Sequence, residues 1–408
     1  MKKNIEKGNT LIVKGPSRIT LLEGELDVFG KILHPDKGSP TQDTTNFKAQ
    51  NTLIIPSAQC FPLYAQENSI LEIYTNNEEN LELIEENSIS DKWIEIKNEI
   101  LKVLKNEKES PIKIMVLGIS SGKTTLIKYL ANNFIKEGLK GGYLDSDLGQ
   151  QIIYVPTTIN LGSIKDYIVS SEDITTEMTE FIGATFPKGD YKFIVSISCR
   201  KMIDEFTTKN KDIDFILIDT DGWIKTEAGV IYKNYFIKAV DPDIIIAFHD
   251  DSIEELIDIE KTVSEKNKKT FLIEEKNEFF YEKDKEERRF LRQSQFSKKF
   301  ETFRKMTIPL NEMKFIKTEY DKEKDEIFEK NININELINL PYHYVIVGLL
   351  TENSELVEIG LLFTINSEKN YILLFSDLTY KEQLKVKKIL LGSLRLSTKG
   401  NHQGYLYL

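Results

Sequence analysis

Short hydrophobic runs separated by glycine and proline dominate the first 78 residues of the chain. The runs cover residues 11–13, 19–22, 26–29, 53–55 and 70–74. The turn-forming residues between them are Gly15, Pro16, Gly24, Pro35, Gly38 and Pro56. Short β-forming runs with this punctuation are typical of strands joined by tight turns. We therefore predict a small N-terminal sandwich or barrel.

Residues 91–104 show a different pattern, in which apolar residues recur every three or four positions. They are Trp93, Ile96, Ile100 and Leu104. This spacing predicts a helix with one buried face, and Asp91 is a suitable N-cap. We expect this linker helix to close an N-terminal β-rich domain that covers residues 1–105.

Hydrophobic runs alternate with helix-period stretches from about residue 111 to residue 275. Strand candidates cover residues 112–117, 215–218, 244–248 and 271–273, and residues 276–304 are charged and expected to be helical. Such alternation is typical of an α/β domain with a mostly parallel sheet. We assign residues 106–304 to this central domain.

A strand-like pattern returns from about residue 305. The strand candidates are residues 344–350, 357–365, 371–375 and 389–396. They predict a C-terminal β-rich domain that covers residues 305–408. We expect the highly charged residues 319–330 to form a solvated connection.

Composition and charge narrow the classes of protein. The 408 residues are 40% hydrophobic and 29% charged, and no apolar stretch approaches the ~20 residues of a membrane span. The first eight residues are too polar for a secretory signal, and two cysteines supply neither a disulfide framework nor a cysteine zinc site. We expect an intracellular protein, cytoplasmic or, in a eukaryote, nuclear, with no membrane partner. The net charge of −11 favours a small, concentrated site for any nucleic acid.

A phosphate-binding loop is the strongest chemical signal. Residues 118–125 read Gly-Ile-Ser-Ser-Gly-Lys-Thr-Thr between a predicted strand and a predicted helix, which is the context this motif requires. Backbone N–H groups and the positive helix end bind phosphate oxygens in such loops. The predicted nucleotide-binding residues are Gly118, Ser120, Ser121, Gly122, Lys123, Thr124 and Thr125.

The loop also assigns individual roles. Lys123 would reach the β- and γ-phosphates, and Thr124 would place its hydroxyl on Mg²⁺. The loop is short, because three residues separate its glycines where the usual motif has four. The alternative interpretation is a Gly-Ser turn followed by a chance lysine.

Carboxylates follow two predicted strands. Residues 144–150 read Leu-Asp-Ser-Asp-Leu-Gly-Gln, and Asp219 ends the apolar run at residues 215–218. Ligands of α/β sheets bind at the carboxyl ends of the strands. Asp219 is therefore a candidate to orient Mg²⁺, directly or through water. Asp147 is the candidate for contact with an acceptor, with a strand-end cap as the alternative, while Asp145 could simply face solvent.

Several segments, taken in order, resemble the polynucleotide 5′-hydroxyl kinase family. They are Gly15 to Gly30, Asp145-Ser-Asp-Leu-Gly-Gln150, Val155-Pro-Thr-Thr158, residues 181–187, Asp219-Thr-Asp-Gly-Trp223, Glu287-Arg-Arg-Phe-Leu-Arg292 and Leu391 to Leu396. This family includes the kinase subunit of the pre-mRNA cleavage complex, the nucleolar rRNA-processing kinase and their archaeal relatives. The resemblance covers nearly the whole chain, and the short phosphate loop is its clearest departure.

The resemblance implies transfer of the ATP γ-phosphate, with Mg²⁺, to the 5′-OH end of RNA or DNA in RNA processing. Processing proteins would then be partners. Asp147 would accept the proton of the 5′-OH or orient that hydroxyl. Arg289 and Arg292 would form an Arg-x-x-Arg lid over the phosphate, with Arg288 as a substitute in register. A solvated charged helix face is the alternative for these arginines.

The resemblance also implies substrate contacts. Trp223 would stack on the terminal base, and Thr158 and Thr185 would offer hydroxyls to substrate phosphate. Gln150 could position phosphate or metal-bound water, or could instead stabilise a turn. The alternative for Trp223 is a core residue that seals the sheet edge.

Two other functions stay open. The short loop favours an ATP-binding scaffold subunit that has lost turnover, whereas Lys123, Thr124, Asp147 and the arginine pair favour catalysis. A third possibility is a P-loop enzyme that acts on a small molecule. Trp223 and the two flanking β-rich domains argue against it, because a metabolite kinase would not need them.

Overall fold

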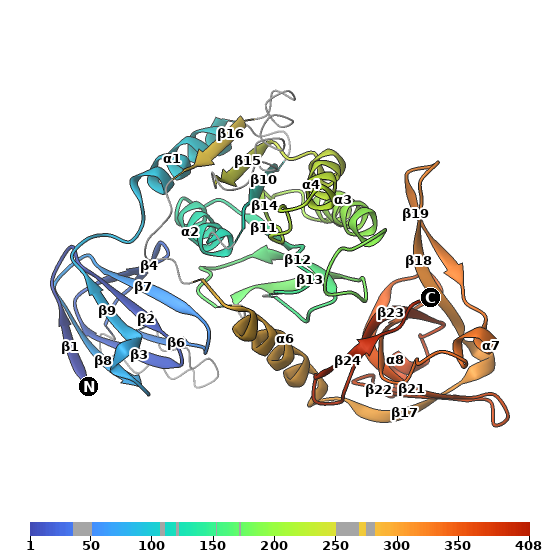
Figure 1. Cartoon of the computed structure of the whole chain (residues 1–408). Coiled ribbons are helices and arrows are strands. Elements are labelled where there is room, and N and C mark those ends of the chain that lie inside the picture. The colour runs from blue at the N-terminus through green and yellow to red at the C-terminus, as the bar shows by residue number, and fades with distance from the viewer. Residues whose placement is uncertain are drawn as a thin grey trace.

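The computed structural model describes residues 1–35, 51–106, 111–119, 122–151, 153–170, 173–249, 269–274 and 282–408. A central α/β layer lies between an N-terminal and a C-terminal β-rich part (Figure 1). This is the predicted fold class. In the described ranges no helix combines the length and the hydrophobicity needed to cross a membrane.

The N-terminal part is a β-sandwich, as predicted. One sheet has the order β1 (Lys2–Ile5), β8 (Ser69–Thr75), β3 (Ser17–Glu23), β6 (Thr52–Ile55). The other has the order β5 (Lys31–Leu33), β4 (Leu26–Val28), β7 (Cys60–Ala65), β2 (Thr10–Lys14), β9 (Leu81–Ile84). Buried positions alternate along β7 and β8, so each strand contributes one face to the core between the sheets. A 3₁₀ turn, η1 (Glu78–Asn80), leads into β9.

The linker helix α1 (Asp91–Asn106) packs with the central layer. Its apolar stripe, which includes Trp93, Ile96 and Ile100, is buried in one cluster with Leu126 and Leu130 of α2 (Lys123–Lys136). The helix and its stripe form where the periodicity predicts them. Their packing joins α1 to the central layer, although the sequence assignment placed the helix with the N-terminal domain.

The central sheet has the order β13 (Thr175–Phe181), β12 (Thr158–Ile164), β11 (Gly141–Asp145), β14 (Phe215–Asp219), β10 (Ile112–Leu117), β15 (Ile244–Phe248), β16 (Lys269–Ile273). The five strands from β11 to β16 in this order run parallel, whereas β12 and β13 are antiparallel additions. In the β14 registers Asp219 lies opposite both Asp145 and Val116, so three strands end together.

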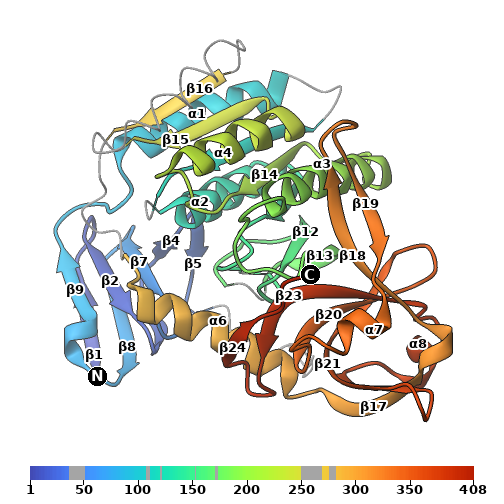
Figure 2. The ribbon, with the colours of Figure 1, turned by 45° about the vertical axis from the view of Figure 1, so that its right-hand side comes forward.

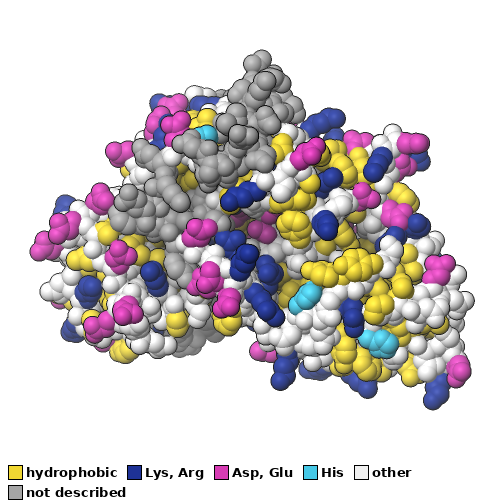
Figure 3. Space-filling view, in the orientation of Figure 1, with side chains coloured by type: hydrophobic (Ala, Val, Ile, Leu, Met, Phe, Trp, Pro, Cys, Tyr) yellow, Lys and Arg dark blue, Asp and Glu magenta, His cyan; other side chains and the backbone are white. Residues whose placement is uncertain are grey.

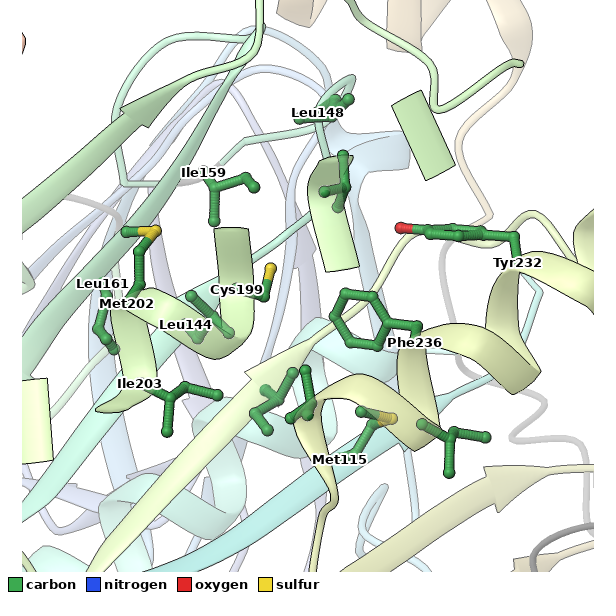
Figure 4. Packing of buried hydrophobic residues seen from close by; sticks show 14 of the residues in the cluster. Met115, Leu144, Leu148, Ile159, Leu161, Cys199, Met202, Ile203, Tyr232 and Phe236 are labelled. Atoms are coloured by element: carbon green, nitrogen blue, oxygen red, sulfur yellow. The ribbon is translucent and has the colours of Figure 1, made fainter. Parts of the chain in front are cut away.

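Helices cover both faces of this sheet. Helices α1 and α2 bury one face, and α3 (Tyr191–Lys209) and α4 (Glu227–Val240) bury the other. Figure 4 shows the second core, where Cys199 and Met202 of α3 and Phe236 of α4 pack over Leu144 and Ile159 of the sheet. Burial on both faces explains why the central strands are continuous apolar runs in the sequence.

The C-terminal part is a larger sheet. Its order is β17 (Arg304–Pro309), β22 (Tyr371–Ser376), β21 (Leu356–Asn366), β20 (Val345–Leu350), β23 (Lys388–Leu396), β18 (Lys314–Asp321), β19 (Glu326–Asn331), and β24 (His402–Tyr405) pairs with β23. Three short turns, η3 (Leu310–Glu312), α7 (Ile334–Leu337) and α8 (Tyr380–Gln383), connect its strands. The β-rich C-terminal part matches the sequence prediction.

The charged residues 319–330 are mostly exposed, as expected, but they belong to two paired strands and not to a connection, so that part of the prediction is wrong. They lie in the antiparallel hairpin of β18 and β19, which reaches the central domain. Tyr320 stacks on Phe193 of α3 with ring centroids 4.2 Å apart. The hydroxyls of Tyr320 and Tyr235 both donate to Asp325 Oδ1, at 2.6 and 2.5 Å. The charged sequence therefore belongs to a hairpin that packs against α3 and α4.

Helix α6 (Lys285–Phe300) runs below the central sheet between the two β-rich parts (Figures 1 and 2). A capping box of Asp284 and Glu287 starts it. Phe296 and Phe300 are buried among residues of the C-terminal sheet, including Ile346 and Leu361. This packing fixes which face of α6 turns toward the central domain.

Candidate active site

A cavity of about 570 Å³ lies at the carboxyl edge of the central sheet. Its wall includes residues of the N-terminal sandwich, the start of α1, the start of α2, the segments after β11 and β14, the Thr185–Phe186 segment, and α6. Most of the residues that the sequence singled out lie in this wall. They are Gly122, Lys123, Thr124, Thr125, Asp147, Gln150, Thr185, Asp219, Trp223 and Arg292.

The phosphate-loop residues lie at the first turn of α2. Gly122 has φ = +85°, in the left-handed region that favours glycine, and α2 begins at Lys123. Lys123 Nζ donates to the carbonyl oxygen of Gly118 at 2.7 Å, so the side chain folds back across the loop. Ser120 and Ser121, also predicted to bind nucleotide, lie outside the described residues.

The predicted metal residues are in direct contact. Thr124 Oγ1 donates to Asp219 Oδ2 at 2.7 Å, and the hydroxyl of Tyr143 donates to the same oxygen at 2.9 Å. Burial, followed by the nearby carboxylate of Asp219, raises the pKa of Tyr143 well above its usual value, so the phenol keeps its proton and remains a donor. The two hydrogen bonds hold the Asp219 carboxylate in one orientation.

Side-chain hydrogen bonds tie the strand ends together at this edge. Ser146, just after β11, donates from both its N–H and its hydroxyl to the carbonyl oxygen of Asp219, at 3.1 and 2.7 Å. Thr220, just after β14, donates to the carbonyl oxygen of Val116 in β10 at 2.7 Å. Hydrogen bonds therefore hold the ends of three neighbouring strands together at this edge of the sheet.

Asp147 lies in the cavity wall and is held by its own turn. Its Oδ1 accepts hydrogen bonds from the N–H groups of Gly149 and Gln150, at 2.9 and 3.0 Å. Burial and the neighbouring carboxylate of Asp221 raise the pKa of Asp147 above its usual value. Asp147 therefore both caps its own turn, as the alternative interpretation expected, and lines the cavity. Asp145 is buried, and the solvent-facing alternative for it is wrong.

A buried ion pair lies behind this edge, and sequence reasoning missed it. Lys233, on α4 and 1% exposed, places Nζ 3.0 Å from Asp221 Oδ2. The other oxygen of Asp221 accepts the N–H of Trp223 at 2.8 Å. Burial lowers the pKa of Lys233, and Asp221 opposes that change. The sequence signal was a lysine within the apolar face of residues 229–240.

Trp223 and Phe186 form an aromatic pair in the wall. Their ring centroids are 4.5 Å apart, and the rings are tilted by 46°. Trp223 Nε1 donates at 3.1 Å to Thr226 Oγ1, the N-cap of α4. Phe186 is largely exposed, whereas Trp223 is half-buried against the core. The indole is thus anchored on one edge while part of its surface stays in the cavity.

The arginine pair differs from the prediction. Arg288 and Arg292 line the cavity, whereas Arg289 is exposed and absent from the described part of the wall. The reason is the phase of α6. Residues four apart share a helix face, so Arg288 and Arg292 continue the row of Phe296 and Phe300, which are docked on the C-terminal sheet. Arg292 therefore lies in the wall, and Arg288, the substitute in register that the sequence analysis named, lines it where Arg289 does not.

Two of the other three predicted substrate contacts reach the cavity. Gln150 and Thr185 line it, and Gln150 Nε2 donates to the carbonyl oxygens of Gly149 and Arg288, at 2.9 and 3.2 Å. Thr158 does not reach the described wall. It is fully buried and donates to the carbonyl oxygen of Val155 at 2.7 Å, because β12 runs inside the sheet. The expected role of Thr158 in substrate contact is therefore not supported by its position.

Lys128 was also missed by the sequence analysis. It lies one helical turn beyond Thr124, and its Nζ donates to the carbonyl oxygen of Val169 at 3.0 Å. The ammonium group lies 5.8 and 5.4 Å from the ring centroids of Phe29 and Phe61 in the N-terminal sandwich. Burial lowers the pKa of Lys128 to about 8. This contact makes the sandwich part of the cavity wall.

Comparison with known proteins agrees with this geometry. Residues 118–302 match the family model described as mRNA cleavage and polyadenylation factor CLP1 P-loop. A polyribonucleotide 5′-hydroxyl-kinase of Methanocaldococcus jannaschii is 27% identical over 346 residues, which are 76% of this chain and 93% of that protein. A protein of the same name from Pyrococcus furiosus is 35% identical over 192 residues, which are 47% of this chain and 51% of that protein.

Solved structures share the fold. Wild-type Clp1p in complex with Pcf11p superposes with a TM-score of 0.74 over 97% of each chain, at 15% identity. The resemblance expected from the sequence is therefore confirmed in family and in fold. The chain spans nearly all of the Methanocaldococcus relative and about half of the Pyrococcus relative.

Proposed function

We propose, since residues 118–302 belong to the CLP1 P-loop family, that this protein is an ATP-dependent polynucleotide 5′-hydroxyl kinase acting on RNA ends. One observation carries the proposal. Lys123 and the Thr124–Asp219 pair line the same cavity as Asp147 and Arg292. The cavity therefore contains a candidate residue for each part of the reaction. Lys123 would bind the nucleotide phosphate, Thr124 and Asp219 the metal ion, and Asp147 the acceptor hydroxyl, while Arg292 would neutralise charge.

The residues at the start of α2 suit a triphosphate. The free N–H groups of a helix N-terminus and the Lys123 ammonium group attract phosphate oxygens. Thr124 and Asp219 would hold Mg²⁺, which when bound neutralises phosphate charge.

Asp147 is the proposed acceptor of the 5′-OH proton. As the bond from the 5′ oxygen to the γ-phosphorus forms, the bond to the β-phosphate oxygen breaks, ADP leaves and the hydroxyl proton passes to the carboxylate. A pKa raised by burial and by Asp221 makes Asp147 a better base than a solvated aspartate. Arg292, with its neighbour Arg288, would balance negative charge on the transferring group.

The aromatic pair favours a polynucleotide over a small metabolite. Bases stack on aromatic rings whatever their sequence, as an enzyme that modifies ends requires. Trp223 and Phe186 would bind the terminal base, and Gln150 and Thr185, in the same wall, would contact substrate phosphate. Because the matched family is that of an mRNA cleavage and polyadenylation factor, we include RNA-processing proteins among the partners, and hence an intracellular site of action.

The test is transfer of labelled γ-phosphate to synthetic RNA. The protein is incubated with labelled ATP, Mg²⁺ and a 5′-OH oligoribonucleotide, with the same oligonucleotide carrying a 5′-phosphate as the matched control. Label on the 5′-OH strand alone supports the proposal. Asp147→Asn should lower kcat while ATP affinity is retained, because the carboxylate acts on the acceptor.

The same assay distinguishes the alternative that the short loop favours. A scaffold subunit would bind ATP with ordinary affinity and would label neither oligonucleotide. A small-molecule kinase would leave both strands unlabelled and transfer label in a metabolite screen. Either result would contradict the proposed activity.

A further inference from the structure

We infer that β24 and the exposed side of α6 form a binding strip for the nucleotides that follow the reacting end of a single-stranded substrate. The strip consists of Arg289, His402, Tyr405 and Tyr407. This inference rests on the proposed function. Three of the four residues, His402, Tyr405 and Tyr407, lie in the C-terminal domain, which the family match over residues 118–302 does not reach.

The position of β24 beside α6 is fixed by close packing. Gly400, in the turn before β24, has φ = +76°, and a Cβ there would lie 2.8 Å from Phe296 Cβ and 2.9 Å from the carbonyl oxygen of Gln293. In addition, the amide of Gln293 donates to Asn401 Oδ1. Only glycine fits so close to the helix. The strand therefore lies directly against α6, as Figures 1 and 2 also show.

The end of the chain presents aromatic rings outward. Tyr405 and Tyr407 are 45% and 80% exposed, whereas Leu406 between them is 2% exposed and packs into the C-terminal core. Tyr407 lies two residues beyond the end of β24, and the buried Leu406 between the tyrosines leaves both of them on the outside. Their ring centroids are 6.1 Å apart, and that of His402 lies 4.8 Å from Tyr405. Three rings therefore form a continuous exposed row.

Positive charge connects this row to the cavity. Arg292 lines the cavity together with Asp147. Burial lowers the pKa of Arg292, and the charges of Asp147 and Tyr405 oppose that change, so Arg292 interacts electrostatically with both the carboxylate and the row. Arg289, outside the described cavity wall, contributes its positive charge to the lowered pKa of His402. Figure 3 shows Lys and Arg side chains gathered near the centre of this face, with a histidine and hydrophobic side chains beside them. An end held at Asp147 thus has a basic and aromatic path leading away from it.

His402 acts in this row as a ring and not as a cation. Burial, followed by the positive charges of Arg289 and Arg292, lowers its pKa below the usual value. The imidazole is therefore neutral at pH 7. In this proposal the arginines contact the substrate phosphates, and His402 and the two tyrosines stack on its bases.

These features fit single-stranded nucleic acid. Sequence-tolerant binding of single strands combines basic side chains that follow the backbone with exposed aromatic rings on which bases stack. A duplex hides its base faces and offers nothing to the rings. The protein carries a net charge of −11, so a small basic strip leading out of the cavity is also where a polyanion meets the least repulsion.

Substrate length provides the test. The KM of a 5′-OH dinucleotide is compared with that of a 5′-OH decamer for the wild type and for the double variant Tyr405→Ala and Tyr407→Ala. We expect the double variant to raise the decamer KM about tenfold, because one or two stacked bases are lost. The dinucleotide KM, the ATP KM and kcat should not change.

Two controls keep the result specific. Replacing both tyrosines by phenylalanine keeps the rings and should leave the decamer KM near the wild-type value. Tyr380→Ala removes a 75% exposed tyrosine from α8 of the same domain and should have no effect. An unchanged decamer KM in the alanine double variant, or an equal loss for both substrates, would overturn the inference. The first of these is also the result expected if the strip binds a protein instead.

Salt dependence gives an independent readout. Binding of a 3′-labelled decamer is measured by anisotropy across a salt series for wild type, Arg289→Gln and the control Arg304→Gln. Losing one phosphate contact should reduce the slope of log K against log salt by about 0.7 in Arg289→Gln. A slope equal to that of the control would contradict the role of Arg289. If the wild type phosphorylates no oligonucleotide of any length, the proposed function fails first, and the anisotropy series still tests the strip.

Discussion

The two sides of the cavity are built in different ways. On the sheet side, Thr124, Asp219 and Asp147 come from the ends of neighbouring elements; Thr124 donates to Asp219, and backbone N–H groups of its own turn hold Asp147. On the α6 side, Arg288 and Arg292 are placed by the docking of a helix on a distant domain. The comparison separates groups that their own strand ends hold in place from charged groups whose position depends on the packing of remote segments, although the proposed reaction uses both.

Lys123→Ala should show the largest effect, because it removes the only phosphate-reaching cation that the loop motif supplies. We expect kcat/KM to fall by about 10³-fold or more and ATP binding to weaken. Single-turnover transfer and ATP titration measure the two effects. Lys136→Ala, at the exposed far end of the same helix, is the matched control. Wild-type ATP affinity in Lys123→Ala would contradict the assignment of the loop.

Lys233→Met tests the ion pair that supports the sheet side. It leaves the Asp221 carboxylate buried without its partner, and we expect the free energy of unfolding to fall by about 3 kcal/mol. Chemical denaturation measures the change, with the exposed Lys238→Met of the same helix as the control.

A double variant, Lys233→Met with Asp221→Asn, completes this test. Removing both charges should recover much of the lost stability, because no unpaired charge remains buried. Additive losses in the double variant would show that the two groups do not depend on each other.

Arg292→Ala compared with Arg289→Ala tests the phase of α6. Arg292 lines the cavity, so its loss should lower kcat by about 10²-fold, whereas Arg289→Ala should leave kcat within a fewfold of the wild type. Transfer to a saturating 5′-OH dinucleotide measures kcat, because this short substrate does not reach the proposed strip on β24 and α6. A larger loss in Arg289→Ala would restore the Arg-x-x-Arg pair that the sequence suggested.

The same contrast explains what the sequence could predict. Lys123, Thr124 and Asp219 are set by local motifs, and a parallel sheet brings its carboxyl ends to one edge, so their meeting followed from pattern alone. The fold class followed for the same reason, because apolar runs buried on both faces and alternating strands leave clear periodic signals.

The residues that escaped prediction depend on contacts between distant segments. The role of Lys233 depends on its ion pair with Asp221, which lies on a different segment of the chain. Arg288 was named only as a substitute for Arg289; its place in the wall depends on the docking of Phe296 and Phe300, whose four-residue spacing was the available signal. Thr158 was misplaced because β12 lies inside the sheet, and charge in residues 319–330 masked a hairpin that Tyr320 anchors.

Trp223→Ala has the smallest expected effect. It tests a residue that could serve either to hold the sheet edge together or to bind the substrate base. The indole is held by Asp221 through its backbone and by Thr226 through its ring nitrogen, so it belongs to the fixed side. Its contact with the tilted ring of Phe186 and its place in the wall belong to recognition. If recognition dominates, the RNA KM should rise about tenfold while the ATP KM stays unchanged, because one base loses its stacking partner.

Trp223→Phe decides between the two roles of this residue. Phenylalanine keeps an aromatic face but cannot donate to Thr226, so a stacking role predicts nearly wild-type RNA KM, whereas an anchoring role predicts losses like those of Trp223→Ala. Steady-state kinetics with RNA and ATP varied in turn give both constants. Equal increases in the two KM values would mean that the indole mainly holds the sheet edge together, and that the terminal base is read elsewhere.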